Sequence, residues 1–64
     1  MTLSEYTKQV MEKLMADPLL LPPILPVQLV KKNEGLIAEN WEFGEHVENT
    51  AIMLRLRHKE EAHK

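Results

Sequence analysis

Hydrophobic residues recur at helical spacing near the start of the chain. Leu3, Tyr6, Val10 and Leu14 are three or four residues apart, and most positions between them are polar. This spacing places the apolar side chains on one stripe of a helix, with the polar side chains around it. The pattern predicts an amphipathic helix over residues 2–16 with one buried face.

The two ends of this helix are also marked in the sequence. Thr2 precedes Glu5 by three residues, which is the spacing of a capping box, and Ser4 is a competing cap. At the other end stands Asp17-Pro18. Proline restricts the residue before it and cannot donate the next backbone hydrogen bond, so the helix is expected to end there.

The segment over residues 17–26 ends in PLLLPPILP, with four prolines and five large aliphatic residues. Its prolines remove backbone donors and favour an extended, polyproline-like path. The last four residues also match the PxxP spacing of polyproline ligands, but flanking basic residues are absent. The aliphatic side chains need cover from this chain or from a neighbour. Four of them are predicted interface residues: Leu20, Leu21, Ile24 and Leu25.

A short helix over residues 27–34 is expected next. Pro26 suits the first turn of a helix because its φ is fixed and its missing N–H is not needed there. Lys31 and Lys32 fall in the last turn, where positive charge is favourable, and Gly35 is suited to a left-handed position after it.

The longest helical pattern covers residues 36–62, with Gly44 as its weak point. A glycine costs roughly 1 kcal/mol in a helix interior, so the pattern favours a short helix before Gly44 and a long one after it. One apolar stripe consists of Leu36, Phe43, Val47, Ala51 and Leu54. A second stripe consists of Ile37, Trp41, Ile52 and Leu56. In a continuous helix the two stripes would cover more than one neighbouring helix can bury, which predicts a partner interface that includes Trp41, Ile52 and Leu56.

Size and composition support a partner chain. A chain of 64 residues forms one domain and buries only about 60% of its unfolded surface. It has no cysteine, so disulfides and thiolate zinc sites are excluded and oligomerisation, most simply a homodimer, is expected. Hydrophobic residues make up 44% and charged residues 28%, which is typical of a folded domain. No signal peptide or stretch of about 20 apolar residues is present, so a cytoplasmic protein without a membrane span is expected.

Acidic and imidazole side chains gather at one place. Glu39, Glu42 and His46 are three to four residues apart, a spacing that can put metal ligands on one helix face. A solvated helix face explains the same pattern, so no metal site and no cofactor is predicted. His58 and His63, five residues apart, are expected to be solvated.

The only basic cluster is formed by Arg55, Arg57 and Lys59 together with His58, and the two arginines and Lys59 are the predicted nucleic-acid contacts. Basic residues on a helix can contact DNA, and Lys31 and Lys32 could add to such a surface. Two features weigh against this function. Leucines alternate with the arginines, and two glutamates follow at once. The net charge of −2 does not exclude DNA binding, because a helix-turn-helix dimer can be basic at its recognition surface alone.

The sequence therefore predicts an all-α protein, a small helical bundle over residues 1–64 with a proline-rich crossover, completed by association of copies. It contains one serine and no cysteine, and it lacks a glycine-rich phosphate loop, so an enzyme is not expected. A non-enzymatic regulator, assembly factor or accessory subunit that binds proteins through apolar helix faces is the first hypothesis. A small dimeric DNA-binding transcriptional regulator is the alternative.

Overall fold

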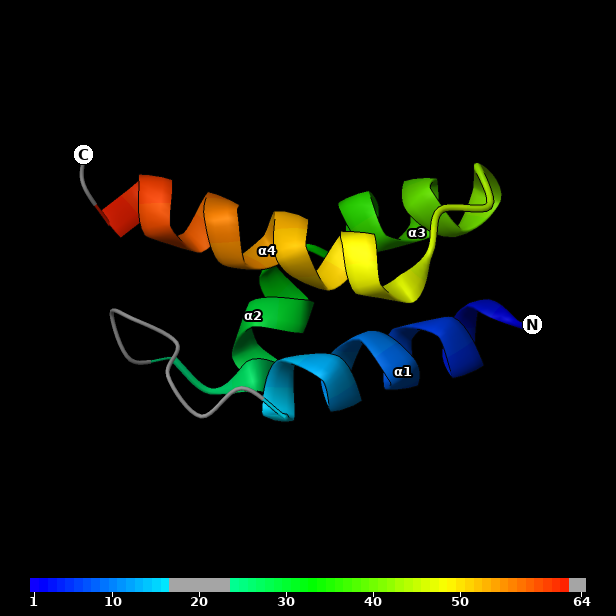
Figure 1. The fold of residues 1–64 in the computed structure, drawn as a ribbon, viewed down its shortest axis with the longest axis horizontal. Helices are drawn as coiled ribbons and strands as arrows, with labels where there is room; N and C mark the ends of the chain where they lie inside the picture. Colours follow the sequence, from blue (N-terminus) through cyan, green and yellow to red (C-terminus); the bar gives the residue numbers. More distant parts are fainter. Residues whose placement is uncertain (17–23, 63–64) are drawn as a thin grey trace.

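The computed structural model describes residues 1–16 and 24–62, and within these residues it contains helices and no strand (Figure 1). The helices are α1 (Leu3–Met15), α2 (Pro26–Lys32), α3 (Glu34–Glu42) and α4 (Val47–Ala62). The predicted all-α fold is confirmed. Most of the predicted proline-rich segment, with Leu20 and Leu21, lies outside the described residues.

Helix α1 begins at the predicted cap. Thr2 has an extended backbone, and its Oγ1 accepts a hydrogen bond from the Glu5 amide at 3.1 Å. The Thr2 hydroxyl also donates to Glu5 Oε1 at 3.2 Å. Because the first amides of a helix lack internal partners, this cap stabilises the start of α1 by about 1 kcal/mol. Three residues of the predicted apolar stripe are buried: Tyr6, Val10 and Leu14.

A single residue, Asn33, separates α2 from α3. Pro26 lies in the first turn of α2, as the sequence predicts. The Asn33 side-chain Nδ2 donates to the Leu29 carbonyl at 2.8 Å, and the Asn33 carbonyl accepts from the Ile37 amide at 3.0 Å. The buried Asn33 thus satisfies the end of one helix with its side chain and the start of the next with its backbone.

The prediction that Gly35 ends the short helix in a left-handed conformation is wrong. Gly35 lies inside α3, and Gly44 is the one described residue with a positive φ. The expected helix over 27–34 accordingly ends at Lys32. The reason is that the Asn33 side chain takes over a carbonyl of α2, so no glycine cap is needed there.

Gly44 instead breaks the second half of the chain. Its φ is 74°, and its amide donates to the Trp41 carbonyl at 3.1 Å, which ends α3. The break predicted at Gly44 is confirmed, and a continuous helix over 36–62 is excluded. Each of the two apolar stripes predicted for that helix is therefore divided at Gly44, with its earlier residues before the break and its later residues on α4.

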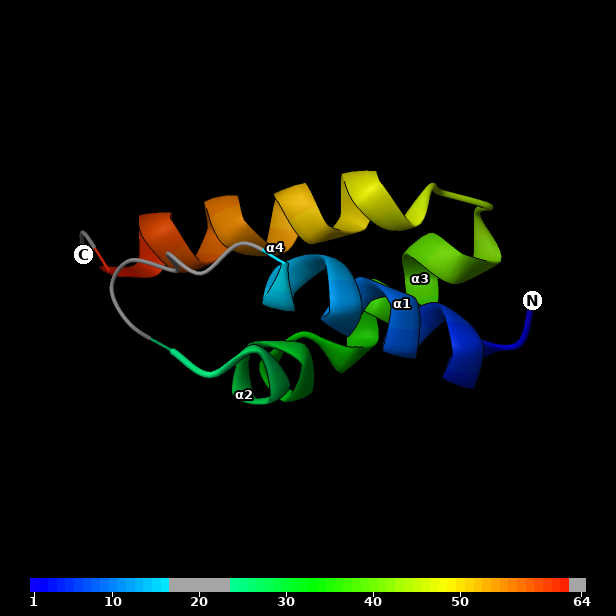
Figure 2. The ribbon, with the colours of Figure 1, turned by 60° about the horizontal axis from the view of Figure 1, so that its bottom comes forward.

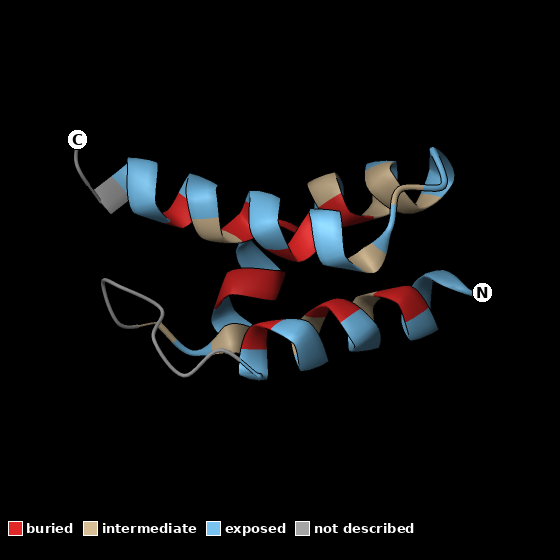
Figure 3. Ribbon diagram, in the orientation of Figure 1, coloured by how far each residue is buried: buried red, intermediate tan, exposed pale blue. Residues whose placement is uncertain are grey.

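The core lies where the four helices meet. Helices α1 and α4 lie side by side and run in the same direction (Figures 1 and 2). Helix α2 contacts both of them, and α3 packs on α1 and α2. Buried positions turn toward the centre of the molecule, and exposed positions turn outward (Figure 3). The buried apolar residues are Tyr6, Val10, Leu14, Leu29, Val30, Ile37, Ala51 and Leu54.

None of the described helices has both the length and the apolar character that crossing a bilayer requires.

Candidate interaction surface

Helix α4 carries apolar side chains on both of its faces. On the inner face, Ala51 and Leu54 are buried against the other helices. On the opposite face, Ile52 remains 46% exposed and Leu56 remains 55% exposed. A helix of a small domain normally exposes polar side chains on its outer face. The exposed pair, Ile52 and Leu56, is therefore not part of the hydrophobic core of this chain.

We define the outer face of α4 by six exposed residues: Glu48, Asn49, Ile52, Leu56, Lys59 and Glu60. Ile52 and Leu56 are four residues apart, so they are neighbours on the helix surface. At about 100° per residue, Glu48 and Lys59 lie on one side of this pair and Asn49 and Glu60 lie on the other. The result is an apolar centre with charged and polar borders on both sides.

The two borders face different neighbours. Arg55, next to the border of Glu48 and Lys59, donates from Nη2 to the Lys13 carbonyl of α1 at 2.8 Å. Met53, next to the other border, accepts a hydrogen bond at Sδ from Asn40 of α3 at 3.4 Å. The residues that flank the outer face thus contact α1 on one side and α3 on the other. The outer face itself points away from both helices.

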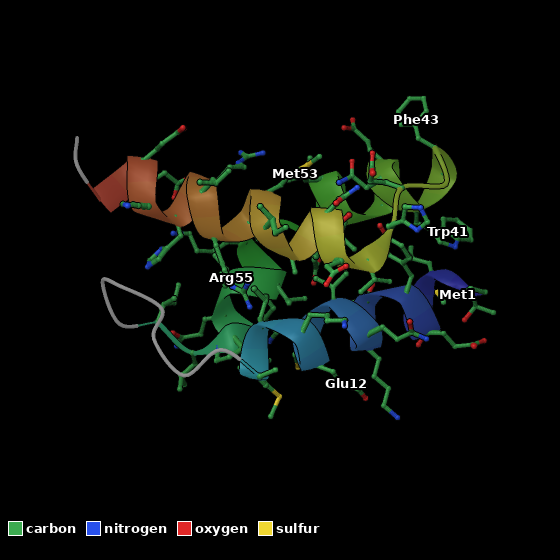
Figure 4. All side chains as sticks on the ribbon, in the orientation of Figure 1. Met1, Glu12, Trp41, Phe43, Met53 and Arg55 are labelled. Carbon is green, nitrogen blue, oxygen red and sulfur yellow. The ribbon has the colours of Figure 1, made fainter. Side chains whose placement is uncertain are left out.

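The remaining predicted interface residues separate into two groups. Ile24 and Trp41 are partly buried and pack against the core. The Trp41 indole also donates to the Met1 carbonyl at 2.9 Å, and the two residues lie together at one end of the molecule (Figure 4). Leu25 is exposed, but it precedes α2 and does not share a helix with Ile52 and Leu56. The structure thus brings Ile52 and Leu56 together, while the other described candidates lie elsewhere.

Phe43 departs from its predicted place in a buried stripe. It follows α3 in the turn before Gly44, and its ring points away from the helices (Figure 4). It is among the exposed large hydrophobic residues. The helix break at Gly44 accounts for this, because Phe43 no longer shares a helix with Val47 and the residues that follow it.

The three residues of the predicted basic cluster do not form one surface. Arg55 turns toward α1, where it caps a carbonyl in the last turn of that helix (Figure 4). Arg57 and Lys59 are exposed. Residues two apart on a helix point in widely different directions, so Arg57 does not share a face with Arg55 or with Lys59.

The prediction of a solvated His58 is wrong. His58 is only 9% exposed on the inner face of α4, one turn beyond the buried Leu54. Solvation was predicted because His58 and His63 are five residues apart and do not align on a helix, but the four-residue spacing from Leu54 places His58 on the inner face. His63 lies outside the described residues.

The candidate metal ligands are separated by the same helix break. Glu39 and Glu42 belong to α3, whereas His46 follows the Gly44 turn. Among the described residues, no group of three or more histidine, aspartate or glutamate side chains is arranged to hold a metal ion. The spacing that suggested a shared helix face depended on a continuous helix.

A buried polar network joins three helices and was not anticipated from the sequence. Tyr6 Oη lies 2.8 Å from the Glu45 carbonyl, to which it donates, and 2.6 Å from Thr50 Oγ1. Asn40 Nδ2 donates to Thr50 Oγ1 at 3.0 Å. Since the Tyr6 hydrogen is used at Glu45, the Thr50 hydroxyl donates to Tyr6. This network fixes the N-terminal half of α4 against α1 and α3.

An open cleft of about 570 Å³ lies beside this network, between α1, the Gly44 turn and the start of α4. Its volume is in the range of small-molecule sites. Its lining mixes acidic, basic and aromatic side chains, among them Lys13, Trp41, Glu45 and His46, and contains neither serine nor cysteine.

Comparison of the chain with protein-family models, curated proteins and solved structures gives no match.

Proposed function

We propose that this protein is a small non-enzymatic interaction protein that binds another polypeptide through the outer face of α4. The observation that carries this proposal is the exposure of Ile52 and Leu56 on the side of α4 that faces away from the core. Full burial of one such side chain is worth about 1.5–3 kcal/mol. Since each side chain is about half covered already, a partner that buries both gains roughly 1.5–3 kcal/mol from this pair.

The borders of the outer face suit a protein partner. An apolar centre with a polar rim is the usual arrangement of a specific protein interface. Glu48 and Lys59 on one border, with Asn49 and Glu60 on the other, offer both charge signs and an amide. Such a border can select a partner by charge while the apolar centre supplies affinity.

Binding to DNA remains the alternative function. Arg57 and Lys59 are exposed and Lys31 adds a third exposed cation, but Lys32 pairs with Glu61 at 3.4 Å. A basic surface able to neutralise several phosphates would need these side chains on one face. Arg55 is engaged with α1 and Arg57 points away from Lys59, so the arrangement supports protein binding better.

Site-specific photo-crosslinking tests the proposal. A benzophenone amino acid replaces Leu56 in one variant and Glu12, an exposed residue of α1, in a control variant. We expect illumination in cell lysate to attach a polypeptide at position 56 and not at position 12. Equal labelling at both positions, or no adduct at either, would contradict the proposal.

A salt titration distinguishes DNA binding from protein binding. Binding of a fluorescent DNA duplex that weakens steeply with salt and is lost in Arg57→Gln would favour DNA recognition. Photo-adducts with protein and weak, salt-insensitive signals with DNA would favour the interaction protein.

A further inference from the structure

We infer that the first occupant of the outer face of α4 is a second copy of this chain, with the two α4 helices antiparallel. This inference rests on the proposed function and names its partner. The two-fold axis passes between Ile52 and Leu56, near position 54. Ile52 of each copy then faces Leu56 of the other, which is the reciprocal contact that a symmetric dimer requires.

The charges on one border of the outer face support this orientation. Glu48 and Lys59 are eleven residues apart, which is close to three helical turns, so they lie on the same side of α4. Glu48 lies about 9 Å before position 54 along the helix axis, and Lys59 lies about 8 Å after it. An antiparallel second copy therefore brings its Lys59 next to Glu48, and the same contact recurs at the other end. Each dimer gains two such pairs.

The other border is complementary in the same way. Asn49 lies about as far before the axis as Glu60 lies after it, so the antiparallel copy brings its Glu60 next to Asn49. One Asn49 amide hydrogen is directed to Glu45 Oε1 at 2.8 Å. The side-chain amide has a second hydrogen, which can be donated to the Glu60 carboxylate of the other copy.

A parallel pair brings different side chains together. A two-fold axis along the helices places each border of one copy against the opposite border of the other, so Lys59 meets Glu60 and Glu48 meets Asn49. Parallel helices also place like ends of their macrodipoles side by side, whereas antiparallel helices place opposite ends together. The antiparallel orientation is therefore favoured, and the two orientations differ in whether Lys59 pairs with Glu48 or with Glu60.

The size of the surface sets the expected affinity. A helix of 16 residues is about 24 Å long, and its apolar centre consists of two side chains. This is smaller than the surface of an obligate dimer. Since the chain also forms a core of its own, we expect a reversible dimer with a dissociation constant of roughly 1–100 μM.

Sedimentation equilibrium of the purified chain tests the dimer. We expect the mass to rise from monomer to dimer as the concentration increases through the micromolar range. Ile52→Asp should remain monomeric. Val27→Asp is the matched control, because Val27 is 44% exposed, close to the 46% of Ile52, but lies on α2. Loss of the dimer in both variants to the same extent would overturn the assignment to α4.

Charge exchange tests the orientation with exposed side chains. Lys59→Glu alone and Glu48→Lys alone should each weaken the dimer about tenfold at low salt, because two pairs turn repulsive. The combined exchange should restore the wild-type dissociation constant. Lys8→Glu, on the exposed side of α1, makes the same change of net charge as Lys59→Glu and should have no effect. In a parallel dimer Glu60→Lys, and not Glu48→Lys, would restore the association lost in Lys59→Glu, and that result would overturn the antiparallel orientation.

The outcomes separate this inference from the proposed function. A monomer at every concentration, with a foreign polypeptide attached at position 56 in lysate, would refute the second copy as occupant and leave the interaction function standing. A monomer with no adduct at position 56 would refute both. Circular dichroism on each variant establishes that lost association does not come from lost helicity.

Discussion

The hydroxyl of Tyr6 links α1 to the turn before α4 and to α4 itself, and Tyr6→Phe removes it with little change of shape. The ring lies in the core, where phenylalanine fills the same space. The change leaves the Glu45 carbonyl without its donor and the Thr50 hydroxyl hydrogen without its acceptor, although Thr50 Oγ1 still accepts from Asn40. Thr50 is 0% exposed, so water cannot replace the lost hydrogen bond without opening the core.

The expected loss follows from these two groups. A buried polar group left without its partner costs about 1–3 kcal/mol. The Thr50 hydroxyl is fully buried, whereas the Glu45 carbonyl lies next to the open cleft and can regain water. The penalty therefore counts for the Thr50 hydroxyl alone, which gives a decrease of about 2 kcal/mol in the free energy of unfolding. In a domain of this size it corresponds to a fall of roughly 8–16 °C in Tm.

Urea unfolding followed by circular dichroism measures this loss, at one fixed protein concentration because association adds to apparent stability. A double-mutant cycle with Thr50→Val isolates the pair, and the double variant should lose about 1 kcal/mol less than the sum of the single variants. Thr7→Val on α1 is the control for the loss of a hydroxyl outside the network. If Tyr6→Phe costs no more than this control and the cycle is additive, the network does not join α1 to α4.

Three further changes test the fold at other points. Gly44→Ala should lower the free energy of unfolding by about 1–2 kcal/mol because of the positive φ, whereas Gly35→Ala should raise it by about 0.5 kcal/mol because α3 has open space there. Equal changes in the free energy of unfolding of the two variants, measured by chemical denaturation, would contradict this. Leu54→Ala should cost about 2–5 kcal/mol because the side chain is fully buried, and a smaller loss in urea unfolding would mean that the inner face of α4 is loosely packed. Arg55→Met should lower the free energy of unfolding by about 1 kcal/mol through the lost cap on α1, while Arg57→Met should leave the Tm unchanged. Equal Tm values for these two variants would refute the capping role of Arg55.

Local signals in the sequence were sufficient for the beginnings and breaks of helices. Thr2 with Glu5 located the start of α1, Pro26 located the start of α2, and Gly44 located the end of α3. Each acts through its own backbone or through a residue three positions away. Such effects are contained in a short stretch of sequence and do not depend on the rest of the fold.

The errors of the sequence analysis have different causes. Asn33 ends α2 with a side-chain bond to a carbonyl four residues earlier, so the nearby Gly35 was assigned the wrong function. His58 was judged by its spacing from His63, although its spacing from Leu54 places it on the buried face of α4. Arg55 was assigned to a basic cluster, but its guanidinium reaches a carbonyl 42 residues earlier. Only for Arg55 does the position of the side chain depend on a partner that no local pattern reveals.

The candidate surface was likewise predicted in part from the local sequence, and the rest depended on the fold. The apolar character of Ile52 and Leu56 was evident from the sequence, and so was an excess of apolar stripes. Which stripe faces outward depended on the break at Gly44, since that break lets α4 turn its other stripe toward α1. The charge pattern of the borders became meaningful only when that direction was known.

The pairing of α1 with α4 has a consequence for how the chain acquires its structure. These helices come from opposite ends of the sequence, and the contact between Tyr6 and Thr50 spans 44 residues. Helical proteins usually fold quickly through contacts between sequence neighbours, but here nearly the whole chain must close as a loop before the core forms. During synthesis, α2 and α3 can pack on α1 first, but the contact between α1 and α4 forms only after α4 has emerged from the ribosome. The core is therefore completed only once α4 has been synthesised.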